Sequence, residues 1–131
     1  MAVHTVSSYD GELQALHATI SRLGGFVEDL VWRAFRALVD RHPQRAQQIV
    51  KDDIYVDALE REVQNATIKL IAQRQPVADD LRYALSVLKI AAELERVGDL
   101  AKNIAQRAMT VSRGDRKSTR LNSSHLVISY A

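Results

Sequence analysis

The feature that most restricts the fold of this chain is a run of apolar residues between about residues 8 and 40. These residues recur at alternating spacings of three and four: Leu13, Leu16, Ile20, Leu23, Val27, Leu30, Ala34 and Ala37. Because an α-helix turns once every 3.6 residues, this spacing places all of them on one side of a single long helix. Such a stripe must be covered by other elements. The sequence therefore predicts a helix over about residues 8–40 that packs against further helices.

Two prolines mark the starts of two further helices. Pro43 and Pro76 each follow a break in the helical pattern, and proline suits the first turn of a helix because its φ is preset and it has no N–H to satisfy. We therefore predict helices over about residues 43–73 and 76–112. Connections this short make consecutive helices antiparallel neighbours. The predicted fold is all-α, an antiparallel up-down-up three-helix bundle over residues 1–112.

Some apolar residues fall outside the predicted core stripes. Trp32, Phe35 and Val39 lie off the stripe of the first helix, and the third helix is apolar on one side early and on nearly the opposite side later. Since a three-helix bundle buries one stripe per helix, the surplus predicts a further layer or partner, and we expect a homo-oligomer. The alternative is a wider contact within the core.

Three glycines carry structural predictions. Gly24 and Gly25 lie inside the first predicted helix, where each costs about 1 kcal/mol relative to alanine. We interpret this pair as a point of close contact between helices. Gly114 is interpreted as the stop of the third helix.

Carboxylates at helical spacing are the main chemical feature. Asp53, Asp57 and Glu60 follow one another at i, i+4 and i+7 on the second predicted helix, and Glu95 and Asp99 are one turn apart on the third. On the third helix, the apolar strip opposite these acids is predicted to comprise Ile90, Leu94, Val97, Ala101, Ile104 and Ala108. Carboxylates so spaced share one side of a helix, and paired carboxylate oxygens are ligands for hard cations. The five acids are therefore candidate metal ligands. The alternative is a solvated surface with weak ion pairs.

The distribution of charge argues against a nucleic-acid partner. The net charge of +2 comes from the end of the chain. That segment contains four basic residues and one acidic residue: Arg113, Arg116, Lys117 and Arg120, and Asp115. The remaining residues are close to neutral and lack the concentrated basic footprint that phosphate-backbone binding needs. We expect no nucleic-acid binding.

The composition of the chain also predicts its cell compartment and whether it inserts into a membrane. Cysteine is absent, which suits a reducing compartment. There is no signal-peptide pattern at the start and no apolar stretch of about 18 residues. We expect a cytoplasmic protein that does not insert into a membrane.

The histidines argue against an enzyme. His4, His17, His42 and His125 fall in separate segments and form no Glu-x-x-His motif, which the carboxylate-bridged metalloenzymes of helical bundles require. We expect no catalysis. A carboxylate-rich metalloprotein and a purely structural oligomerisation module remain alternative hypotheses.

Two segments, QRQPVADDLR at residues 73–82 and KIAAELERVGDLAKNIA at residues 89–105, resemble the PhoU family of phosphate-uptake regulators. The resemblance covers about residues 5–112. It implies two similar three-helix repeats, of which this chain resembles only the first. It also implies a divalent or iron-type metal cluster on the acidic motifs matched by Asp53, Asp57, Glu60, Glu95 and Asp99, which would be incomplete without the second repeat.

The same resemblance implies a function and partners. The expected function is regulation of phosphate uptake and repression of the phosphate-starvation response. The expected partners are the ATPase of the phosphate ABC transporter and the phosphate-sensing histidine kinase.

The segment from residue 113 to residue 131 departs from this pattern. It contains DRKSTRLNSSHLVISYA, which is similar to translated sequencing-adapter sequence. We interpret residues 113–131 as an appended artefact outside the family fold.

Overall fold

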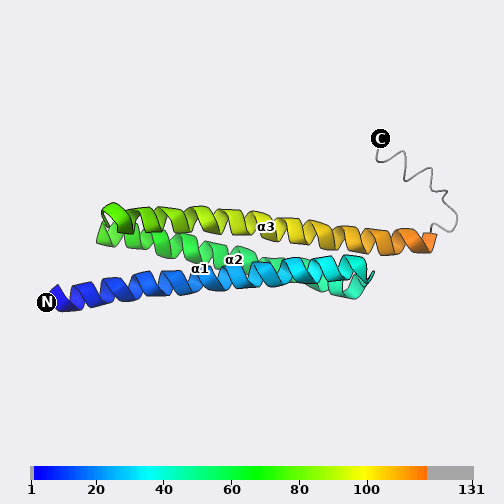
Figure 1. The fold of residues 1–131 in the computed structure, drawn as a ribbon, viewed down its shortest axis with the longest axis horizontal. Coiled ribbons are helices and arrows are strands. Elements are labelled where there is room, and N and C mark those ends of the chain that lie inside the picture. Colours follow the sequence, from blue (N-terminus) through cyan, green and yellow to red (C-terminus); the bar gives the residue numbers. More distant parts are fainter. Residues whose placement is uncertain (1, 118–131) are drawn as a thin grey trace, which may run out of the picture.

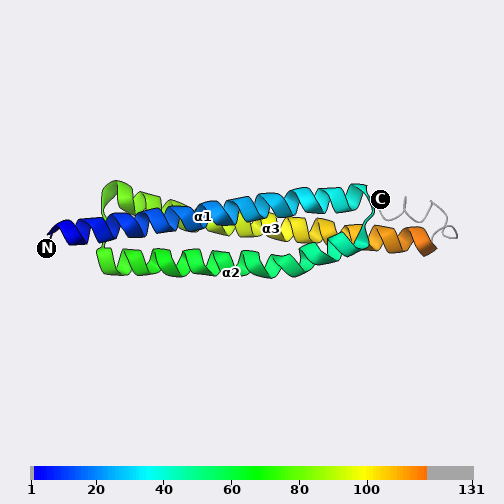
Figure 2. The same cartoon turned by 90° about the horizontal axis from the view of Figure 1, so that it is seen from below.

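Three long helices lie side by side in the computed structural model, which describes the backbone of residues 2–117 and the side chains of residues 8–112. They are α1 (Ala2–Val39), α2 (Pro43–Arg74) and α3 (Ala78–Lys117). Figure 1 shows that α1 and α3 run in the same direction and α2 runs back between them in sequence, and that α3 projects past the α1–α2 connection. The view in Figure 2 shows the same three helices side by side from below. The predicted all-α, up-down-up three-helix bundle is confirmed.

Short capped connections set the antiparallel order. Pro43 is the first residue of α2, as predicted, and the ring Nδ1 of His42 accepts a hydrogen bond from the backbone N–H of Arg45 at 3.3 Å. At the other end of α2, Gln75 adopts the left-handed conformation with φ 48°, and its N–H donates to the carbonyl of Ile71 at 3.1 Å. Such caps satisfy backbone groups that the helix ends leave free.

Three predicted helix ends are wrong. The first helix begins at Ala2 rather than near residue 8, and the third begins at Ala78, so that Pro76 lies in the connection. The third helix also continues through Gly114 to Lys117. No described glycine has a positive φ, so Gly114 does not adopt the left-handed conformation by which glycine ends helices. Residues 118–131, most of the segment interpreted as an artefact, lie outside the described residues.

The core confirms the stripe predicted for α1 and corrects the one predicted for α3. Six of the predicted residues of α1 are buried: Leu16, Leu23, Val27, Leu30, Ala34 and Ala37. The buried positions of α3 are mostly small: Ala84, Val87, Ala91, Gly98, Ala101, Ala105 and Ala108. Ile90 and Val97, predicted to be buried, are 49% and 38% exposed. Small side chains let α1 and α2 approach α3 closely, and the larger residues are left outside.

Ion pairs tie the helices together near both ends. Arg74, at the end of α2, donates to both carboxylate oxygens of Glu12 on α1, at 2.8 and 3.3 Å, and to the hydroxyl of Ser8 at 2.9 Å. Towards the other end, Arg33 on α1 pairs with Asp52 on α2 at 2.9 Å. A planar guanidinium group suits such bidentate contacts with a carboxylate. The arginine of the QRQP segment therefore joins α1 to α2.

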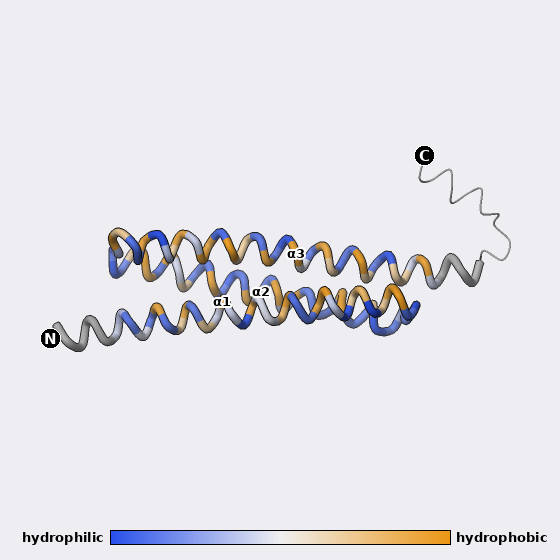
Figure 3. Tube along the Cα trace, viewed as in Figure 1, coloured by the Kyte–Doolittle hydropathy of each residue, from blue (hydrophilic) through white to orange (hydrophobic). Residues whose placement is uncertain are grey.

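Large apolar side chains remain exposed on the outer sides of α1 and α3. We call these residues the α1–α3 face: Trp32, Phe35, Val39, Ile90, Val97, Leu100 and Val111. Leu94 of α3 packs beside Gly24 of α1, and Ile90 and Val97 lie one turn on either side of Leu94. Apolar and polar residues alternate along the coloured parts of the three helices (Figure 3). The predicted exposure of Trp32, Phe35 and Val39 is confirmed.

Candidate cation site between α2 and α3

At Gly98, α3 lies in close contact with α2. A Cβ atom on Gly98 would lie 3.1 Å from Cγ1 of Val56 and 3.6 Å from Oδ1 of Asp53. Because Gly98 has no side chain, α2 can approach α3 this closely. The predicted close contact at Gly24 and Gly25 is wrong: a Cβ on Gly24 would meet Leu94 at an ordinary 3.9 Å, and nothing lies within 4 Å of one on Gly25.

The five predicted acids gather around this contact. The pKa of Glu95 is raised above its usual value, first by partial burial and then by the negative charges of Glu60, Asp57, Asp99 and Asp53. Because such effects fall off steeply with distance, the carboxylates of α2 and α3 share one local field. We call these five residues the acidic face. The structure brings together what the sequence spacing placed on two separate helices.

Asp53 is the most unusual member of the acidic face. It is 4% exposed, and its Oδ1 atom has no hydrogen-bond partner among the described residues. Its Oδ2 atom lies 3.7 Å from Nζ of Lys102. Burial raises the pKa of Asp53, the charges of Asp57 and Asp99 raise it further, and Lys102 opposes them. A buried carboxylate oxygen without a partner is costly, so the site favours binding of a proton or a cation.

The other four acids are more accessible. Asp57, Glu60 and Glu95 are half-buried and Asp99 is exposed, and Glu60 accepts a hydrogen bond from Nε2 of Gln64 at 2.6 Å. Within the described residues, no group of three or more His, Cys, Asp or Glu side chains is arranged to hold a metal ion. The oxygen donors are of the type that hard cations prefer, but the unpartnered Oδ1 of Asp53 is itself buried. The donor type suits a cation, but the described side chains form no closed coordination shell.

Comparison with known proteins identifies the family. The family model described as the PhoU domain matches residues 20–108. The chain belongs to the PhoU family. Curated PhoU relatives include the phosphate-specific transport system accessory protein PhoU homolog of Caulobacter vibrioides (strain NA1000 / CB15N), which is 44% identical over 88% of this chain and 50% of the relative. The homolog of the same name from Rhizobium meliloti (strain 1021) is 44% identical over 83% of this chain and 46% of the relative.

A solved PhoU structure shares the fold. The crystal structure of PhoU from Pseudomonas aeruginosa superposes with a TM-score of 0.78 at 34% identity, covering 80% of this chain and 50% of that chain. The chain therefore spans about half the length of the PhoU relatives it matches. Among the described residues, no helix combines the length and the hydropathy needed to cross a membrane.

Two residues beside these acids, Gly98 and Lys102, were not predicted from the sequence. Both lie within the LERVGDLAKNIA segment that carries the family resemblance. Lys102 follows Asp99 by three residues and Glu95 by seven, so helical periodicity alone places it on the acidic side of α3. That spacing was a usable signal. The contact made by Gly98 was not predictable, because it depends on the register of α2 against α3.

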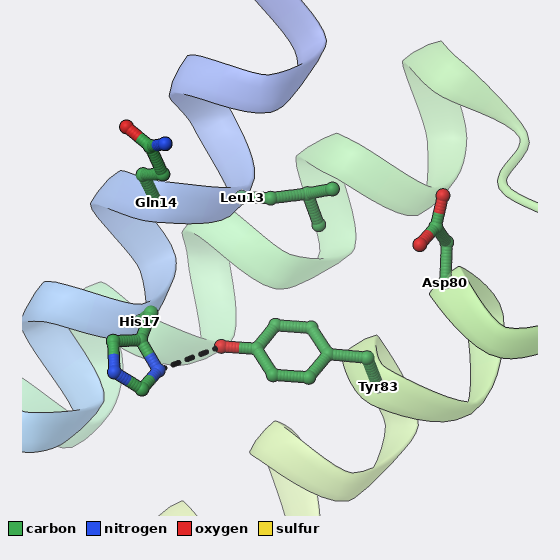
Figure 4. Close-up of a pocket in the computed structure, with 5 residues that line it drawn as sticks. All are labelled: Leu13, Gln14, His17, Asp80 and Tyr83. Carbon is green, nitrogen blue, oxygen red and sulfur yellow. Dashed lines mark hydrogen bonds between the residues drawn. The ribbon is translucent and has the colours of Figure 1, made fainter.

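A hollow lies between α1 and α3, away from the acidic face (Figure 4). It is lined by Leu13, Gln14, His17, Asp80 and Tyr83. Nδ1 of His17 and the hydroxyl of Tyr83 are 3.3 Å apart and point towards one another across it. The Asp80 carboxylate already accepts a hydrogen bond from Tyr9 at 3.0 Å. These contacts join α1 to α3, and the sequence analysis assigned no function to them.

Asp53 gives the protein a pH dependence that the Asp53→Asn variant should lack. Its pKa is raised in the folded state, so its contribution to stability is greatest below the unfolded-state pKa and is lost as pH rises through the folded-state pKa. Lowering the pH from about 7 to about 4 should therefore stabilise the wild type relative to Asp53→Asn. Urea denaturation of both proteins at several pH values measures the difference. Parallel stability curves would contradict the assignment.

Proposed function

We propose that this chain is part of a regulator of phosphate uptake that represses the phosphate-starvation response and performs no catalytic turnover itself. The observation that carries the proposal is the PhoU domain match over residues 20–108. The names of the relatives support it, since they are accessory proteins of a phosphate-specific transport system. We assign its action to the cytoplasm, in contact with the ATPase of the phosphate ABC transporter and the phosphate-sensing histidine kinase.

The acidic face is the proposed control point. A divalent or iron-type cation would be held by Asp53, Asp57, Glu60, Glu95 and Asp99, and its positive charge would offset their mutual repulsion. Support comes from the buried, unpartnered oxygen of Asp53 and from the raised pKa of Glu95 among four other acids. Closing the site around a cation requires the more accessible carboxylates to turn towards Asp53. A change of this kind would couple cation binding to the surface offered to a partner.

Self-association is proposed to involve the α1–α3 face. Trp32, Phe35 and Val39 are each more than half exposed on one side of α1. A second copy of the chain, which carries the same exposed apolar residues, is the proposed occupant. Removing this apolar surface from water would stabilise the association of two copies.

Binding of the purified transporter ATPase to the full chain, with and without a chelator, tests the proposal. Chelation, or the double substitution Asp57→Ala with Asp99→Asn, is expected to weaken binding by about tenfold, the usual size of such couplings. A matched control removes two acids elsewhere, Glu28→Gln with Glu62→Gln, and should change affinity less than about twofold. Absence of binding under every condition would contradict the regulatory role. Equal binding with and without the acids would contradict the control by cations.

A further inference from the structure

A second stripe of residues runs along the outer side of α3, apart from the stripe that packs into the core. The buried stripe uses small residues such as Ala91, Ala101 and Ala105. Residues spaced alternately by three and four share one side of a helix, and the spacing is that of a coiled-coil seam. We call the second stripe the outer α3 seam. Its members are exposed or half-buried: Ile90, Glu93, Val97, Leu100, Ile104, Arg107 and Val111.

Most of the outer α3 seam is apolar surface that the bundle leaves in contact with water. Leu100 at its centre is 55% exposed, Ile90 near one end is 49% exposed, and Val111 at the other end is 41% exposed. The seam is about 30 Å long, at 1.5 Å per residue. A regular apolar strip of this length is typical of a surface that packs against another helix.

The outer α3 seam has the same pattern when it is read in either direction from Leu100. Its other members form pairs at matching distances on the two sides of Leu100, so a twofold axis through this residue places the two members of each pair against one another in two copies. Two pairs are apolar and one joins an acid to a base: Val97 with Ile104, Ile90 with Val111, and Glu93 with Arg107.

The charged pair distinguishes the two possible directions of a second helix. In a parallel arrangement, Glu93 would lie against Glu93 of the second copy and Arg107 against Arg107, and like charges placed together oppose association. In the antiparallel arrangement each Glu93 meets an Arg107. Glu93 is available for this contact, since its side chain is 57% exposed and its ion pair with Arg96 is long, at 3.7 Å.

We propose that two copies of the chain associate through their outer α3 seams, antiparallel and with the twofold axis at Leu100, so that Glu93 of each copy pairs with Arg107 of the other. The proposal rests on the self-association proposed above and adds the orientation and register of the second copy. Glu95 and Asp99 lie on a different side of α3, so the acidic face stays outside this contact.

Sedimentation velocity of the full chain with reversed charges tests this arrangement. Arg107→Glu should weaken the dimer about tenfold, because the symmetry replaces two ion pairs by two contacts between acids. Glu93→Arg should have the same effect for the opposite sign. The combined variant, Glu93→Arg with Arg107→Glu, restores both pairs and should dimerise within about threefold of the wild type. Arg61→Glu, at an exposed position of α2, is the control and should stay within about twofold.

The outcomes separate the antiparallel arrangement from self-association itself. If the wild type dimerises but the single reversals have no effect, or the combined variant stays weak, the antiparallel pairing is overturned and self-association stands. If the wild type is monomeric, self-association fails and the pairing fails with it.

Cysteine cross-linking covers the case in which a reversed charge disturbs folding. The chain has no cysteine, so an introduced thiol is the single one, and a disulfide forms only where two Cα atoms come within about 7 Å. Leu100→Cys should yield a covalent dimer on oxidation. Ile90→Cys and Val111→Cys should cross-link when mixed but not separately, since two copies of either residue stand about 30 Å apart in the antiparallel pair. Cross-linking of Ile90→Cys with itself would overturn the proposal.

Discussion

Replacing Gly98 by leucine is expected to lower the free energy of unfolding by about 3 kcal/mol, at the upper end of the usual cost of overpacking. Even a Cβ atom at this position would lie 3.1 Å from Cγ1 of Val56, which is tighter than an ordinary contact. A leucine side chain would have to push α2 away from α3 or force Val56 and Asp53 out of place. Urea denaturation followed by circular dichroism measures the effect.

The matched control is the same substitution at Gly25. A Cβ atom there meets nothing within 4 Å, and leucine has a higher helix propensity than glycine by somewhat under 1 kcal/mol. Gly25→Leu should therefore be neutral or slightly stabilising. A Gly98→Leu protein as stable as Gly25→Leu would show that α2 and α3 do not approach each other at Gly98.

Loss of self-association is the second large expected effect. The wild-type chain should form a dimer at tens of micromolar, and the double substitution Phe35→Glu with Leu100→Glu should weaken that dimer by at least about thirtyfold, the effect of losing about 2 kcal/mol. Phe35 is 54% and Leu100 55% exposed, so the two substitutions place charge on the α1–α3 face without touching the core. Sedimentation velocity measures the change.

The control for self-association lies on the remaining helix. Ile68 of α2 is 58% exposed and lies outside the α1–α3 face. Ile68→Glu should leave the dimer intact. A wild-type chain that stays monomeric at these concentrations, or a control that dissociates as readily as the double variant, would contradict the assignment of this face.

Helical periodicity predicted the fold because the stripe of α1 is long and made of large residues. From Leu23 to Ala37 the expected positions are buried. The stripe of α3 was harder to predict, since alanine is a weak indicator of burial and its packing positions are largely alanine. Ile90 and Val97 gave a stronger hydrophobic signal and lie outside. The start of α1 and both ends of α3 were also missed, because a residue such as Gly114 can be accommodated within a helix as well as at its end.

The acidic face was predictable in part. The spacings of Asp53, Asp57 and Glu60 on α2, and of Glu95 and Asp99 on α3, follow from the helical repeat. That the two groups meet follows from the antiparallel order and the register of the two helices. The burial of Asp53 could not be predicted from its own helix, because it depends on the missing side chain at Gly98.

A nuclear magnetic resonance titration with Mn²⁺ tests the central claim that the acids of α2 and α3 form one cation site. Paramagnetic broadening is local, so the amide signals that disappear first in the ¹⁵N-labelled full chain show where Mn²⁺ binds. The account predicts that signals from residues 53–60 and 95–102 are lost together at substoichiometric Mn²⁺. Broadening of the two segments at different Mn²⁺ concentrations, or broadening elsewhere first, would contradict it.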